Sequence, residues 1–136
     1  MTSLEALVAL NMAGSIGSSR LNKLLEYFIR PQDIFNASVS ELIKVSGIGE
    51  NLAGRIHSFK KEDLEKELKA AAKLDLKIIT ITGAGYPENL RNIPGAPIVL
   101  YVKGEIRPED NFAIGIVGSH QASFYGLSTA EKFASE

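Results

Sequence analysis

Residues 112–126, with the sequence FAIGIVGSHQASFYG, contain the feature that most constrains the fold of this chain. An apolar run over 113–117 stops at Gly118 and passes directly into small polar residues. A short run of this kind, bounded by glycine, predicts a strand that is covered on both faces. Ser123 is expected to begin the next helix, whose apolar residues are Tyr125, Leu127, Ala130, Phe133 and Ala134. The pattern therefore predicts a buried strand, a loop and a helix in succession.

The loop between this strand and this helix is a candidate anion site. Backbone N–H groups at such a junction point outward without partners and suit a phosphate group. The alternative is that Gly118 only allows a tight turn. A dinucleotide-binding loop needs three glycines in a GxGxxG arrangement and an acidic residue about twenty positions later. The next glycine is Gly126 and the chain ends at Glu136, so the sequence argues against a nicotinamide or flavin enzyme.

Composition excludes several kinds of site. The chain has 136 residues, of which 45% are hydrophobic, and this size suits one ordinary domain or two small ones. It has no cysteine and only two histidines, so we predict no disulfide, no metal and no other cofactor. The N-terminus lacks the features of a signal peptide, and no apolar run approaches the roughly 20 residues that span a bilayer. We therefore expect a cytoplasmic protein without a membrane partner.

The formal net charge of −1 gives no sign of nucleic-acid binding over the whole chain. Residues 1–61 carry seven Lys or Arg against five Asp or Glu, whereas residues 62–136 carry eight against eleven. This mild asymmetry permits a basic face in the first part without demonstrating one.

The first sixty residues are predicted to form two similar helical units. In the first unit, an apolar helix over 4–11 precedes the turn Ala-Gly-Ser-Ile-Gly, and Ser18 or Ser19 is expected to cap the next helix. In the second unit, Ser40 is expected to cap a short helix before a second glycine turn. Residues 31–35 between the units predict a short helical connector.

The second unit contains the sequence LIKVSGIGENLAGRI, which has the apolar-Gly-apolar-Gly turn of a helix-hairpin-helix. Gly47 and Gly49 are expected to allow the tight turn, and Ile48 to anchor it in the core. The N–H groups that open the next helix would then remain free for a DNA phosphate. Lys44 and Arg55 are expected to add positive charge. The same hairpin also serves as a packing or protein-binding module, so this alternative stays open.

Beyond residue 60 the periodicity changes. Residues 60–74 predict a charged amphipathic helix, and residues 77–82 and 97–102 predict strands on either side of a turn-rich segment. We therefore expect three parts, which are a helical hairpin domain over 1–61, a bridging helix over 62–76, and the beginning of an α/β domain over 77–136.

In this order of segments, the chain resembles the N-terminal part of DNA-processing protein A, the DprA or Smf family of bacterial transformation proteins. The resemblance covers nearly the whole chain. It rests on the helical hairpins, on YPENLRNIPGAPIVLYVKGEI and on IVGSHQASFYG. The positions that carry it are Tyr86, Pro87, Leu90, Pro97, Leu100, Tyr101, Lys103, Gly104, Val117, Gly118, Ser119, Tyr125 and Gly126.

The resemblance implies a function. Such proteins bind single-stranded DNA through an extended Rossmann-like domain, usually as dimers, load the RecA recombinase, and have no established catalytic activity. It implies that Gly118, Ser119, His120 and Ser123 form the phosphate-binding loop of this chain. The family has an arginine where this chain has His120. Because arginine keeps its charge at neutral pH whereas an unperturbed histidine largely loses it, we expect weaker DNA binding.

The predicted fold class is α/β, with an N-terminal all-helical domain of paired helix-hairpin-helix (SAM-like) type followed by a partial Rossmann-like sheet. Because the chain stops after one strand-loop-helix unit, we expect a fragment or a truncated product, with an unpaired edge at strand 113–117. The predicted function is binding of single-stranded DNA in natural transformation and recombination, with RecA as a partner and a homodimer in the full-length protein. Two alternatives stay open, a protein-interaction module and an enzyme similar to nucleotide-processing phosphoribohydrolases.

Overall fold

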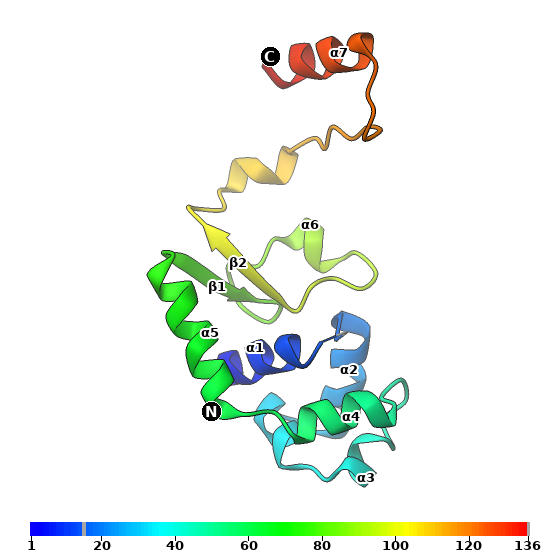
Figure 1. Cartoon of the computed structure of the whole chain (residues 1–136), viewed down its shortest axis with the longest axis vertical. Helices are drawn as coiled ribbons and strands as arrows, with labels where there is room; N and C mark the ends of the chain where they lie inside the picture. Colours follow the sequence, from blue (N-terminus) through cyan, green and yellow to red (C-terminus); the bar gives the residue numbers. More distant parts are fainter. Residues whose placement is uncertain (15, 136) are drawn as a thin grey trace. The chain divides into compact units, whose positions relative to one another are not determined.

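The computed structural model describes residues 1–14 and 16–135 (Figure 1). The chain forms two compact units, Met1–Ile106 and Arg107–Glu136. Ser15, in the predicted first turn, and Glu136 lie outside the described residues.

The first unit begins with helices and ends with a small sheet. Its elements are α1 (Ser3–Ala13), α2 (Ser18–Tyr27), the 3-10 helix η1 (Pro31–Asn36), α3 (Val39–Leu42), α4 (Glu50–His57), α5 (Lys61–Lys73), β1 (Leu76–Thr80), α6 (Glu88–Arg91) and β2 (Val99–Lys103). Every helix and strand predicted before residue 103 is present, with ends shifted by a few residues.

Two predicted helix caps are displaced in the structure. Gly17, and neither Ser18 nor Ser19, is the N-cap of α2. Ser38, two residues before Ser40, caps α3, because only Ser38 has a glutamate three residues later and can form a capping box. The Ser38 Oγ accepts from the Glu41 N–H at 3.3 Å, and the Glu41 Oε2 accepts from the Ser38 N–H at 2.8 Å. The Ser38 hydroxyl also donates to the Glu41 Oε2 at 2.7 Å, and this hydrogen bond, together with the one from the Ser38 N–H, lowers the pKa of the Glu41 carboxyl.

Helix α1 is the centre of the first unit. All residues from Ala6 to Leu10 are at most 1% exposed, so the helix is buried around its whole circumference. A helix that is apolar on all sides needs neighbours on all sides. In Figure 1 the sheet lies over α1 on one side, and α3 and α4 lie on the other. Ile98 and Val99, from the edge of the sheet, belong to the same core cluster as α1.

This central helix explains why the division of the structure differs from the predicted boundary. The bridging helix α5 and both strands pack into the unit of the helical hairpins, and the division falls after Ile106. The two hairpins cover only part of α1, so the sheet is needed to complete the core. Whether residues 1–61 fold on their own stays a prediction.

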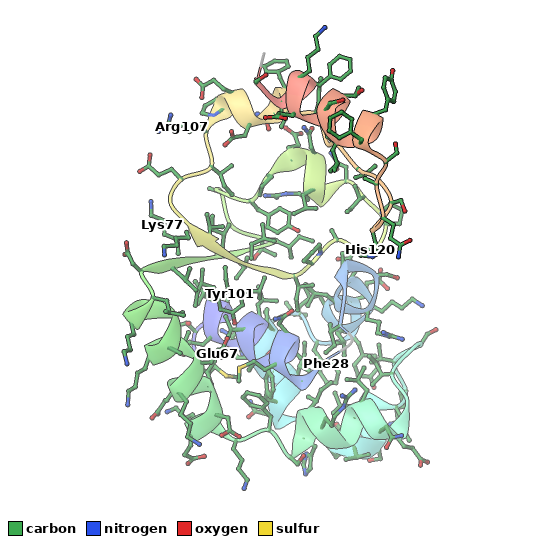
Figure 2. The ribbon with its side chains drawn as sticks, turned by 45° about the horizontal axis from the view of Figure 1, so that its top comes forward. Phe28, Glu67, Lys77, Tyr101, Arg107 and His120 are labelled. Carbon is green, nitrogen blue, oxygen red and sulfur yellow. The ribbon has the colours of Figure 1, made fainter. Side chains whose placement is uncertain are left out.

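The sheet has two antiparallel strands, β1 and β2. Their register runs from Leu76 opposite Lys103 to Thr80 opposite Val99. An antiparallel pair is not the parallel core of a Rossmann-like sheet, so that part of the predicted fold class stays a prediction. The Tyr101 hydroxyl of β2 is buried and has no hydrogen-bond partner among the described residues. Burial raises the pKa of this hydroxyl, and the charge of the nearby Glu67 carboxylate on α5 raises it further (Figure 2).

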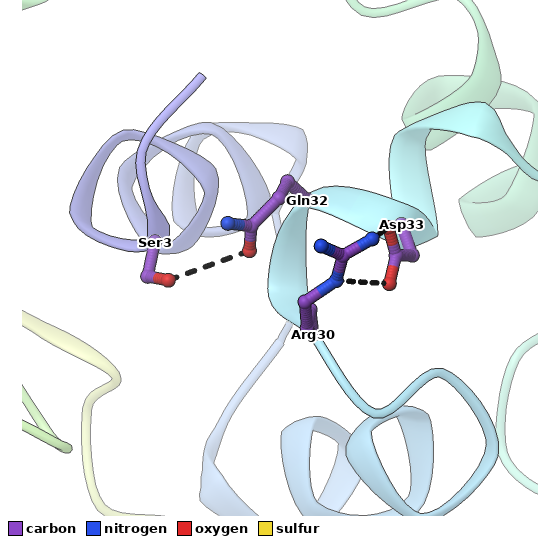
Figure 3. A network of polar contacts seen from close by, with 4 residues as sticks. All are labelled: Ser3, Arg30, Gln32 and Asp33. Atoms are coloured by element: carbon purple, nitrogen blue, oxygen red, sulfur yellow. Dashed lines mark hydrogen bonds and ion pairs between the residues drawn. The ribbon is translucent and has the colours of Figure 1, made fainter.

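The connector η1 joins the two hairpins and was predicted from the sequence. Figure 3 shows how polar side chains hold it. The Arg30 guanidinium donates to both Asp33 carboxylate oxygens, at 2.9 and 2.8 Å, and the Ser3 hydroxyl donates to the Gln32 amide oxygen at 3.4 Å. The second of these contacts ties the connector to the start of α1.

The second unit contains the 3-10 helix η2 (Pro108–Phe112), an extended segment and α7 (Phe124–Ser135). The predicted buried strand over 113–117 is wrong. These residues form no strand, and Ile114 and Val117 are 89% and 94% exposed. A buried strand needs neighbouring strands for its N–H and C=O groups, and residues 107–135 supply none. The predicted helix after Ser123 is confirmed.

Candidate nucleic-acid interface

The turn between α3 and α4 is built as the sequence predicted. Gly47 has a φ of +91°, a left-handed conformation that favours glycine, and Ile48 is 3% exposed and anchors the turn in the core. Gly49 is the N-cap of α4, without a side-chain cap. Its φ of −87° is open to any residue, and a Cβ there would meet no atom within 4 Å. Both glycines are compatible with the turn, but only Gly47 has a backbone conformation that favours glycine over other residues.

The start of α4 is a candidate anion site. The first N–H groups of a helix have no carbonyl partner within the helix, and the helix dipole adds positive potential there. With a glycine cap, no side-chain oxygen occupies this position at α4. Lys44 is exposed and precedes Gly47 by three residues. A DNA contact by Lys44, Gly47, Ile48 and Gly49 stays a prediction.

Arg55 is separated from this group. It lies in the last turn of α4, about 9 Å along the helix axis from Gly49. Its guanidinium lies beside the end of α1, where a Cβ on Gly14 would come within 3.2 Å of the Arg55 Nη1. Arg55 therefore packs on the first hairpin, and a DNA contact by this residue stays a prediction.

Two basic residues of α2 reach the hairpin turn and were missed by the sequence analysis. The Arg20 Nε donates to the Gly47 carbonyl oxygen at 3.1 Å. The Lys23 Nζ lies 3.4 Å from the Ser46 Oγ. Their spacing of three residues places both on one face of α2, which is a usable signal. Nothing local, however, shows that this face lies against a turn more than twenty residues later.

The first hairpin has a closed turn. The Ser18 N–H at the start of α2 donates to the Ala96 carbonyl oxygen at 3.0 Å, and Gly17 forms an antiparallel bridge with Pro97. A Cβ on Gly17 would lie 3.3 Å from the Gly95 carbonyl oxygen. A peptide carbonyl of the same chain thus takes a position that an anion would need.

Tyr86 holds this closing segment in place. Its side chain is 4% exposed, and its hydroxyl donates to the Pro97 carbonyl oxygen at 2.7 Å. The Arg91 guanidinium lies 5.5 Å from the centre of the Tyr86 ring and donates to the Gly83 carbonyl oxygen at 2.9 Å. Burial raises the pKa of the Tyr86 hydroxyl, although the nearby Arg91 charge opposes this.

The predicted phosphate loop of the second unit lies in the extended segment before α7, where Figure 2 marks His120. Gly118, Ser119, His120 and Ser123 are all exposed. The Ser119 Oγ accepts from the Gln121 N–H at 3.2 Å, and the Ser123 Oγ accepts from the Gly126 N–H at 3.2 Å. Ser123 therefore caps α7 in this structure. A phosphate-binding role for the loop stays a prediction.

The described residues contain no group of three or more His, Cys, Asp or Glu that could hold a metal ion. Among the helices formed by residues 1–14 and 16–135, none has the length and apolar character to cross a membrane.

Comparison with known proteins agrees with these observations. The model of the DNA recombination-mediator protein A family matches residues 77–136, and the helix-hairpin-helix motif matches residues 30–59. UvrABC system protein C from Yersinia pseudotuberculosis serotype I is 46% identical over 50 residues, as is the same protein from Yersinia pestis. This match covers 37% of the chain and spans 8% of the length of those relatives. No solved structure matches. The resemblance and the hairpin motif are thus confirmed.

Proposed function

We propose, because residues 77–136 match the model of the DNA recombination-mediator protein A family and residues 30–59 match the helix-hairpin-helix motif, that this chain binds DNA through the hairpin of α3 and α4. The observation that carries this proposal is the open N-terminus of α4, which has a glycine cap, together with the basic side chains Arg20 and Lys23 of α2 at the preceding turn. Backbone N–H groups and ammonium groups recognise phosphate and read no base edges. Binding at the hairpin is therefore independent of sequence.

We extend the proposal to single-stranded DNA as the preferred ligand, to the RecA recombinase as a partner and to a homodimer of the full-length protein. The match of residues 77–136 to the model of this family supports these finer statements. In the same proposal, Gly118, Ser119, His120 and Ser123 bind a second phosphate. Replacing His120 by arginine should then raise DNA affinity at pH 8, because the guanidinium stays charged and donates two hydrogen bonds.

The direct test is a titration of labelled oligo-dT at several salt concentrations. Each phosphate contact should contribute about −0.7 to the slope of log affinity against log salt for a single strand. Lys44→Gln should reduce the slope by about this amount. Absence of salt-dependent binding by the parent protein would contradict the proposed function. Stronger binding to a blunt duplex of equal length would contradict the preference for single strands.

The structure also favours a second candidate, a protein-interaction module. The first hairpin already binds a peptide carbonyl at its turn, since the Ser18 N–H donates to the Ala96 carbonyl oxygen. The open turn of α4 offers the same donors to a carbonyl or carboxylate of another protein. Two results together would favour this candidate. The protein would fail to bind oligo-dT, and it would bind a recombinase in a way that the substitution Gly47→Val abolishes. The enzyme alternative predicts release of base from nucleoside monophosphates.

A further inference from the structure

A hollow of about 300 Å³ opens where α2 passes the segment that leads into the α3–α4 turn. Its lining residues are Lys23, Glu26, Tyr27, Lys44, Val45 and Ser46. None of them belongs to α4, so the hollow is separate from the N–H groups at the start of that helix. Its size lies at the lower end of ligand pockets, which range over about 300–1,000 Å³.

The polar groups of this hollow are suited to a phosphate. Lys23 comes from α2 and Lys44 follows α3, and the Ser46 hydroxyl lies 3.4 Å from the Lys23 Nζ. Neither ammonium forms an ion pair with a carboxylate within the described part of the chain. Glu26 also lines the hollow, so a phosphate is favoured on the side of the two lysines. Two cations and one hydroxyl are common ligands of a backbone phosphate.

The same hollow has an aromatic wall. Tyr27 is 51% exposed, although it is a large aromatic residue at the end of α2. Its ring packs against the ring of Phe28, with the ring centres 4.8 Å apart and the planes tilted by 58°. Phe28 in turn packs against the buried core. The exposed ring is therefore held in place beside the phosphate ligands.

We infer that this hollow binds one nucleotide of a single strand, with its phosphate between Lys23 and Lys44 and its unstacked base on the ring of Tyr27. Bases stack on exposed aromatic side chains without regard to sequence, and only a single strand has bases free to do so. The inference rests on the proposed function and adds a reason for the preference for single strands that the N–H groups of α4 do not give.

The test uses the absence of tryptophan from the chain. Tyr27→Trp introduces a single tryptophan, whose fluorescence should be quenched when oligo-dT binds and much less when a blunt duplex binds. Tyr27→Ala should weaken oligo-dT binding at least about five-fold and leave duplex binding unchanged, because stacking on one base is lost. Tyr27→Phe should bind like the parent. Lys23→Gln should reduce the salt slope by about 0.7.

Two substitutions serve as matched controls. Ile29→Ala truncates an apolar side chain that is 88% exposed, two residues after Tyr27, and Lys73→Gln removes a lysine of α5. Neither should change binding. The inference is overturned if the fluorescence of Tyr27→Trp is unchanged at saturating oligo-dT while Gly49→Val, at the start of α4 and outside the hollow, still weakens binding; the proposed function then stands. A parent protein that does not bind oligo-dT overturns both. The fluorescence result decides even if Tyr27→Ala does not fold.

Discussion

The two helical hairpins of the first unit have nearly the same local structure and different surroundings. Both turns bury an isoleucine, Ile16 at 5% and Ile48 at 3% exposure. Both end in a glycine N-cap with extended backbone and no side-chain cap, Gly17 for α2 and Gly49 for α4. The start of α2 is closed by the Ala96 carbonyl, whereas a Cβ on Gly49 would meet open space.

This difference teaches that a hairpin turn presents hydrogen-bond donors for which many acceptors are suitable, and that the acceptor is decided by what the rest of the chain places there. In the first hairpin the ligand is a carbonyl from the segment before β2, and the hairpin joins the helices to the sheet. In the second hairpin the same donors have no side-chain cap, and a Cβ on Gly49 would meet no atom within 4 Å. Only the second hairpin is available to an external anion.

The largest expected effect comes from exchanging the two glycine caps for valine. Gly17→Val should lower the free energy of unfolding by about 1–3 kcal/mol, because its side chain would press on the backbone of Gly95. Gly49→Val should lower it less and should weaken DNA binding by covering the start of α4. Urea unfolding of both variants measures the loss of stability, and titration with oligo-dT measures the change in DNA affinity. Equal destabilisation by the two substitutions would contradict the comparison.

A smaller effect is expected from Tyr86→Phe, which removes the hydrogen bond to the Pro97 carbonyl oxygen. Loss of one such bond should lower the free energy of unfolding by about 1 kcal/mol. Hydrogen exchange of the Ser18 amide should become faster, because the segment that closes the first hairpin is loosened, whereas amides of the α3–α4 turn should keep their rates. Unchanged exchange at Ser18 would show that Tyr86 does not hold the segment.

Glu50→Gln sharpens the comparison at the open hairpin. Glu50 is the first residue of α4 and places a negative charge where the phosphate is proposed to bind. Removing it should raise DNA affinity about two- to five-fold at low salt, equivalent to about 0.5–1 kcal/mol for an exposed charge pair. Glu62→Gln, in the first turn of α5, is the matched control and should have no effect. If Glu50→Gln and Glu62→Gln bind DNA with the same affinity, the DNA does not bind at the start of α4.

The smallest effect is a pH dependence of stability that comes from two tyrosines. Burial raises the pKa of both Tyr86 and Tyr101 in the folded chain. Their contribution is complete below the pKa of an unfolded tyrosine, about 10, and is lost as the pH rises above it. In Tyr101→Phe, the free energy of unfolding should therefore fall less between about pH 10 and pH 11 than in the parent protein, because one of the two raised pKa values is removed. Urea unfolding over this range would test it, and an unchanged pH profile would contradict it.

The local features of the site were predictable because they depend on neighbouring residues. The Gly47 turn, the buried Ile48 and the helices on either side follow from the spacing of glycine and apolar residues. The errors at the caps have local causes too. Ser38 forms a capping box with Glu41, whereas Ser40 has no glutamate three residues later. Position 49 does not require glycine, since its φ is allowed to all residues.

The features that were missed depend on residues far apart in the chain. Lys23 and Ser46 meet because α2 crosses the second hairpin, and Ser18 meets Ala96 because the sheet packs over α1. The run over 113–117 reads as a buried strand, but burial requires partner strands that residues 107–135 do not contain.

The sequence by itself determined the two hairpins, their glycine turns and the all-round apolar helix α1, because these arise from backbone preferences and short-range periodicity. Only the tertiary structure decided which turn is closed and which is open. An N–H group at a helix start has no preference between a carbonyl and a phosphate, so its partner depends on the segment that core packing brings beside it. Packing of the sheet on α1 brings Ala96 to the first hairpin and leaves the second exposed.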